Sequence, residues 1–211
     1  INLYKYGRGI EATYEQLKRQ RVDKLALHIR MMAVQAEVDK VATIIDVMVN
    51  GDGNTGTQPT THNLTTLDSG ASAVTLSLKA WLAFKMKFAN PYMMTGALAR
   101  EDVSLQMLLL NTGSANMPLV LVQQPGGFGA FTQMNPGLRD NVALGWTPAA
   151  PSLKILGFDR RFAIERVVDI GMTLTEVERF ITRQVQVLVV TEAEGYAVID
   201  KNAINILNVN A

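Results

Sequence analysis

Few residues of this 211-residue chain combine the types and the spacing that catalysis or metal binding requires. The only two histidines, His28 and His62, are far apart in the sequence, and neither belongs to a motif with metal-ligand spacing. The chain has no cysteine, which excludes disulfides, thiolate ligands and a cysteine nucleophile. No serine stands in a nucleophile-elbow pattern. The sequence therefore predicts no catalytic residue, no metal site and no cofactor.

Two glycine-rich segments invite comparison with ligand-binding loops. Residues 51–56, Gly-Asp-Gly-Asn-Thr-Gly, lack the lysine of a phosphate loop and the spaced carboxylates of a calcium loop. Residues 125–129, Pro-Gly-Gly-Phe-Gly, are not followed by a helix with an apolar face, which a dinucleotide site needs. We interpret the first as a flexible helix exit and the second as a mobile loop. An enzyme or small-ligand protein that uses these loops is the less favoured alternative.

Two pairs of acidic residues have a spacing that general acid–base chemistry could use. Glu176 and Glu178, and likewise Glu192 and Glu194, are separated by one residue, which places both carboxylates on one face if the segment is a strand. Such pairs are more often solvated or salt-bridged at a sheet edge. We expect that structural role for both pairs.

A basic group stands at the front of the strongest predicted helix and contains Lys18, Arg19, Arg21 and Lys24. Proteins that grip nucleic acid through its phosphates have a clear basic surplus, whereas this chain has 20 basic and 19 acidic residues and a net charge of +1. Two interpretations stay open for the basic group. It is either a solvated face or one side of ion pairs across a subunit boundary.

The element that carries this basic group is a long helix predicted over about residues 13–50. Thr13 and Gln16 have capping-box spacing, and Asn50 begins the glycine-rich exit. One apolar stripe alternates steps of four and three residues: Leu27, Met31, Val34, Val38, Val41, Ile45 and Met48. A second stripe runs beside it: Val22, Leu25, Ile29, Met32 and Ala36. Together they predict a wide buried face, broader than the two-residue seam of a coiled coil. A helix of about 55 Å favours an extended, flattened molecule.

The remaining chain predicts shorter elements in the order of mixed helices and strands, then strands. Helices are expected over 75–88 and 100–111, with a helical turn at 174–180. Strands are expected at 92–95, 117–122, 162–168, 185–190 and 196–199. Residues 124–151 hold four of the seven prolines and read as a long loop. This order predicts an α+β fold.

The overall composition adds two expectations. No apolar run reaches the length of a membrane span. Hydrophobic residues make up 48% of the chain, and its mean hydropathy of +0.11 is high for a soluble monomer. Part of the apolar surface is therefore expected between subunits.

Two segments of the chain resemble a known family. Residues 6–15, Tyr-Gly-Arg-Gly-Ile-Glu-Ala-Thr-Tyr-Glu, run into the long helix, and residues 49–53, Val-Asn-Gly-Asp-Gly, leave it. Both resemble the segments around the spine helix of tailed-bacteriophage major capsid proteins. Residues 183–200, Arg-Gln-Val-Gln-Val-Leu-Val-Val-Thr-Glu-Ala-Glu-Gly-Tyr-Ala-Val-Ile-Asp, resemble the late peripheral-domain strand of that family. The middle of the chain matches mainly in element order.

The resemblance implies the α+β capsid fold named after a Hong Kong phage, which encapsulins share. It implies the end of an extended hairpin at 1–12, the spine helix of a peripheral domain at 13–50, and an axial domain at 51–154. Peripheral strands follow at 155–192, and a return to the axial domain at 193–211. The N-terminal arm and most of the hairpin are expected to lie upstream of Ile1, so the chain is expected to be N-terminally truncated.

The implied function is structural. The family's members are subunits of icosahedral phage or prophage shells, which form pentamers and hexamers and enclose double-stranded DNA. The resemblance implies no enzymatic activity, no membrane partner, no sequence-specific DNA binding, possible scaffold and portal partners, and assembly in the bacterial cytoplasm into the virion. An encapsulin-like shell around cargo enzymes is the alternative. The candidate subunit-interface residues are Lys18, Arg19, Arg21, Lys24, Phe128, Phe131 and Arg139, the last three in the expected axial loop.

Overall fold

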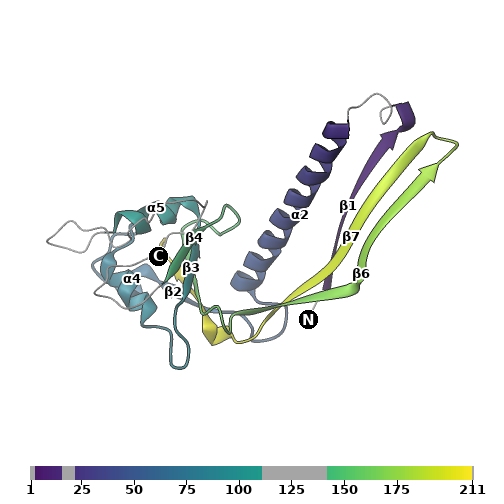
Figure 1. The fold of residues 1–211 in the computed structure, drawn as a ribbon. Helices are drawn as coiled ribbons and strands as arrows, with labels where there is room; N and C mark the ends of the chain where they lie inside the picture. The colour runs from purple at the N-terminus through teal and green to yellow at the C-terminus, as the bar shows by residue number, and fades with distance from the viewer. Residues whose placement is uncertain (1–2, 16–21, 111–141, 211) are drawn as a thin grey trace. The chain divides into compact units, whose positions relative to one another are not determined.

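The computed structural model describes residues 3–15, 22–110 and 142–210 (Figure 1). The chain divides into two compact units. The first unit contains residues 1–44 and 166–197, and the second contains residues 45–165 and 198–211. Helices and mostly antiparallel strands occur in separate segments, which confirms the α+β class.

The first unit pairs one long helix with a three-stranded sheet. The sheet has the order β1-β7-β6, formed by β1 (Leu3–Thr13), β7 (Val185–Val198) and β6 (Ile164–Phe180). Strand β1 runs antiparallel to β7 in an unbroken register from Leu3 opposite Gly195 to Thr13 opposite Val185. Helix α2 (Val22–Asn50) lies alongside β1 and β7 (Figure 1). At 1.5 Å per residue its 29 residues span about 44 Å.

The long-helix prediction is confirmed over Val22–Asn50, whereas residues 16–21 lie outside the described part of the chain. Thr13, the predicted cap, is the last residue of β1. The predicted helical turn at 174–180 is wrong, since these residues continue β6. The three-residue spacing of Leu174 and Val177 is compatible with a helix. Pairing along β7 instead extends the strand, which tertiary context commonly does.

The second unit is built on a five-stranded mixed sheet with the order β2-β8-β5-β3-β4. Its strands are β2 (Thr60–Asn63), β3 (Gly96–Ala99), β4 (Ala143–Trp146), β5 (Lys154–Phe158) and β8 (Ile204–Asn208). Strand β5 is antiparallel to β3 and β8, while β2 is parallel to β8 and β4 to β3. The helices are α3 (Leu64–Leu67), α4 (Leu78–Lys85) and α5 (Glu101–Leu109), with a 3₁₀ turn, η2 (Lys201–Ala203). The core includes Leu64, Trp81, Phe84, Val103, Ile155 and Leu207.

Helices α4 and α5 confirm the predictions over 75–88 and 100–111, in shorter form. Ser77 caps α4, because its hydroxyl accepts a hydrogen bond from the Ala80 amide at 3.1 Å. None of the helices in the described ranges is long and apolar enough to cross a bilayer.

The strand predicted at 92–95 lies four residues later, at Gly96–Ala99. Glycine and alanine have low strand propensity, which hid the strand from sequence analysis. The small residue is required by packing: a Cβ on Gly96 would lie 2.6 Å from Cζ of Phe158 on β5. The strand predicted at 117–122 lies outside the described residues.

Candidate functional site

The predicted interface residues remain predictions. Lys18, Arg19, Arg21, Phe128, Phe131 and Arg139 lie outside the described residues, and Lys24 is in α2 with a side chain that is not described. His28 is exposed on α2, while His62 is in β2, with Nε2 3.4 Å from Oδ1 of Asn205. Within the described ranges, no three His, Asp or Glu side chains group in a way that could hold a metal ion.

The most unusual side-chain arrangement is a buried ionic cluster in the first unit. Lys40 of α2 and Glu194 of β7 are 4% and 0% exposed. The Lys40 Nζ lies 3.0 Å from Oε1 of Glu194, 2.6 Å from Oε2 of Glu192 and 3.1 Å from Oε1 of Glu37. One ammonium group therefore joins two carboxylates of the sheet to the helix that covers it.

Glu194 has further donors from the sheet itself. Arg166 of β6 makes a two-pronged contact: its Nε lies 3.0 Å from Oε2 of Glu194, and its Nη2 contacts Oε1. The Tyr196 hydroxyl donates to Oε2 at 2.8 Å. A buried carboxylate is stable only when its oxygens are paired in this way. The prediction of a salt-bridged acid pair is confirmed for Glu192 and Glu194, but the strand is central in the sheet and not at its edge.

The environment fixes the charge of both central groups. Burial alone would raise the pKa of the Glu194 carboxyl, but hydrogen bonds from Arg166, Tyr196 and Lys40 hold that pKa well below its usual range. Burial alone would lower the pKa of the Lys40 ammonium, and its hydrogen bonds to the glutamates raise that pKa instead. A general acid or base needs a pKa near the working pH. The cluster is therefore suited to clamping α2 onto the sheet and not to proton transfer.

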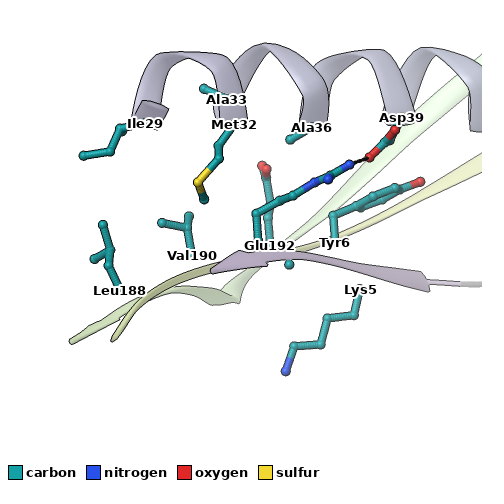
Figure 2. Close-up of a pocket in the computed structure, with 12 residues that line it drawn as sticks. Lys5, Tyr6, Ile29, Met32, Ala33, Ala36, Asp39, Leu188, Val190 and Glu192 are labelled. Carbon is teal, nitrogen blue, oxygen red and sulfur yellow. Dashed lines mark hydrogen bonds and ion pairs between the residues drawn. The ribbon is translucent and has the colours of Figure 1, made fainter. Parts of the chain in front are cut away.

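A cavity of about 520 Å³ lies next to this cluster, between α2 and the strands β1 and β7. Its lining is mainly apolar, and Ile29 and Met32 of α2 project toward Leu188 and Val190 of β7 (Figure 2). Asp39 of α2 also lines the cavity (Figure 2), and its carboxylate forms an ion pair with Arg8 of β1. Ligand pockets need polar groups that converge on the ligand. Here the lining Asp39 and Glu192 are already paired with side chains of the chain itself.

The opposite side of α2 carries an exposed apolar stripe, which we call the α2 seam: Leu27, Met31, Val34, Val38 and Val41. Each of these side chains is between 41% and 64% exposed. The predicted burial of this stripe is wrong over 27–41 and holds only at Ile45 and Met48. The predicted adjacency of the two apolar stripes is also wrong, because at 100° per residue they lie on opposite sides of α2 and only one of them can face the sheet.

Comparisons with known proteins indicate a structural role for the chain. A family model described as phage capsid protein matches residues 1–204. No curated protein matches the chain.

Solved structures with a similar fold include the capsid of an empty GTA particle, which is 13% identical with a TM-score of 0.67, covering 99% of this chain and 74% of that one. Mycobacterium phage Che8 is 12% identical with a TM-score of 0.66, covering 97% of this chain and 70% of that one. The holo-SrpI encapsulin complex from Synechococcus elongatus PCC 7942 is 11% identical with a TM-score of 0.70, covering 98% and 73%. At these identities the likeness shows the fold alone.

Proposed function

This chain belongs to the phage capsid protein family and is a structural subunit of an icosahedral phage shell, and from that premise we propose how its two units serve the shell. The first unit, which holds most of the spine helix α2, corresponds to the peripheral domain, and the second unit corresponds to the axial domain. The unit boundaries differ from the expected domain boundaries, since residues 155–165 fall in the second unit and residues 193–197 in the first. The single observation that carries the proposal is the family match over residues 1–204. The buried ionic cluster of Lys40, Glu192, Glu194 and Arg166, which we call the clamp, supports this assignment. Its Lys40–Glu194 contact joins a long helix to a long sheet.

The proposed partners are further copies of the chain, arranged as pentamers and hexamers. The seven predicted interface residues named above belong to contacts between these copies. Scaffold and portal proteins take part in assembly, which occurs in the bacterial cytoplasm. The shell encloses double-stranded DNA without sequence-specific binding, in keeping with a net charge of +1. The proposed role in the shell is structural and includes no enzymatic activity, as expected of a phage capsid protein.

An encapsulin-like shell around cargo enzymes is the second candidate function. The SrpI encapsulin shares the fold with a TM-score of 0.70. The family match favours the phage shell, because it concerns the sequence and not the fold alone.

The test is negative-stain electron microscopy of the full-length protein, expressed with and without the proposed scaffold and portal proteins. We expect closed shells of uniform diameter, with nuclease-protected DNA in particles assembled with these partners. Only monomers or small closed oligomers under every assembly condition would refute the shell function. Particles that contain a co-purifying enzyme and no DNA would favour the encapsulin alternative.

A further inference from the structure

The α2 seam has the spacing of a coiled-coil interface. Its five residues alternate steps of four and three, the repeat of core positions in a heptad, over about 21 Å of helix. The cavity-lining side chains Ile29 and Met32 project from α2 toward the strands (Figure 2). The helix therefore has one apolar side for its own sheet and a second that the described residues leave exposed.

We propose that the α2 seam pairs with the α2 seam of a second copy of this chain, antiparallel across a two-fold axis. The inference rests on the proposed shell function, which supplies many identical copies. Identical chains form symmetric contacts most simply through a two-fold axis, where the same patch meets itself. The occupant is thus a helix with the same heptad spacing.

The charges beside the seam select the antiparallel orientation. Arg30 and Glu37 flank the seam on one side, each one residue before a seam residue, while the other flank carries His28 and Gln35. In an antiparallel pair like flanks face each other, so Arg30 of each copy meets Glu37 of the other. In a parallel pair, the flank with Arg30 and Glu37 would face the flank with His28 and Gln35 of the other copy. Neither of the two Arg30–Glu37 ion pairs would then form. Charge complementarity therefore favours the antiparallel arrangement.

Both charged groups are available for such contacts. Arg30 is exposed on α2. Glu37 is 71% exposed at its side chain and contacts Lys40 with one oxygen. Its second oxygen is free to accept from a second copy, since the 3.1 Å contact uses Oε1 alone.

The two-fold axis also determines which seam residues of the two copies pack against each other. Placing Arg30 opposite Glu37 brings Met31 opposite Val34 and Leu27 opposite Val38, each twice by symmetry. Four layers bury less than the roughly 800 Å² per partner of a standard interface. The contact is therefore expected to be weak between isolated subunits and to persist in shells, where other contacts hold the copies together.

Disulfide trapping tests the pairing directly, because the chain has no cysteine of its own. Two single variants, Met31→Cys and Val34→Cys, are made in the full-length protein, with an affinity tag on one of them. They are assembled together and oxidised as particles. Opposed seam positions have the Cα separation that a disulfide needs, so we expect tagged–untagged crosslinked dimers at least five-fold above either variant alone. Met31→Cys with Ala26→Cys is the matched control, since Ala26 is exposed on the same helix but lies outside the seam.

A charge swap gives a second measurement on the trapped pair. We expect Arg30→Glu to lower the crosslink yield several-fold, and Arg30→Glu with Glu37→Arg to restore it. Particles that form normally but yield no more crosslink than the control pair would overturn the pairing and leave the shell function intact. Efficient crosslinking of Met31→Cys to itself would instead demonstrate a parallel pair and overturn the orientation. Failure to form particles in the unsubstituted protein would count against the shell function itself.

Discussion

Replacing Lys40 by methionine tests the clamp most directly. The substitution keeps an unbranched apolar side chain, one atom shorter, but removes an ammonium group that contacts Glu37, Glu192 and Glu194. Breaking one partner out of a buried ion pair costs about 3–5 kcal/mol. Glu194 keeps Arg166 and Tyr196 as donors, so we expect the low end, about 3 kcal/mol.

The assay is urea unfolding of the full-length protein, followed by far-ultraviolet circular dichroism. With a denaturant slope of about 2–3 kcal/mol per molar, a loss of about 3 kcal/mol lowers the midpoint by about 1 M. Hydrogen exchange locates the effect. Amides of β7 that lie next to Glu194 are expected to lose protection, whereas those of β5 in the second unit are expected to keep it.

Glu37→Gln is the matched control, because it alters a contact with the same ammonium group at an exposed carboxylate. It is expected to cost less than about 1 kcal/mol. The double variant Lys40→Met with Glu194→Gln should cost at least about 1 kcal/mol less than the sum of the single variants, since it leaves no unpaired buried charge. If Lys40→Met costs no more than Glu37→Gln, the clamp does not stabilise the unit as argued.

Three further predictions concern packing and pH. Ala36→Leu fills part of the cavity between α2 and β7 and should stabilise the protein by about 1 kcal/mol, seen as a raised Tm; a lowered Tm would contradict it. Gly96→Val should destabilise by about 2–3 kcal/mol in urea unfolding because of Phe158, whereas Gly70→Ala, whose nearest neighbour is 3.7 Å away, should be nearly neutral. The hydrogen bonds that Arg161 donates to buried Asp159 lower the pKa of this carboxyl to about 2. The ionised Asp159 should therefore contribute about 2 kcal/mol to the free energy of unfolding above pH 4, and this contribution should be lost as the pH falls from about 4 to 2. The Asp159→Asn variant should not show this loss.

The acidic pair at 192 and 194 shows what spacing alone can predict. The one-residue separation correctly placed both carboxylates on one face of a strand. It could not show that the strand is central or that Lys40, 152 residues away from Glu192, supplies the counter-charge. The partners come from three elements that only the tertiary fold brings together. Their signal in the sequence was a lysine amid the apolar residues of a helix and an arginine in a strand, which are common on protein surfaces.

The shorter elements could be predicted where local residues determine them and could not where packing against other elements does. Helix α4 could be predicted because its cap and apolar spacing are local. Strand β3 could not, because Gly96 and its small neighbours are selected by the ring of Phe158 on another strand. The helical turn predicted at 174–180 failed for the same reason, since pairing with β7 decided between two patterns that the local spacing allows.

The α2 seam connects the composition of the chain to its function. A helix that covers one sheet needs a single apolar stripe, and α2 has two, of which Ile29 and Met32 face its own strands. The second stripe leaves Leu27, Met31 and Val34 more than half exposed, which a subunit working alone would have to solvate. A shell removes that cost, because each subunit is surrounded by copies with the same stripe. The positive mean hydropathy of the chain is thus expected of a protein whose working state is an assembly. On α2, the seam is the stripe of exposed apolar side chains that such an assembly would cover.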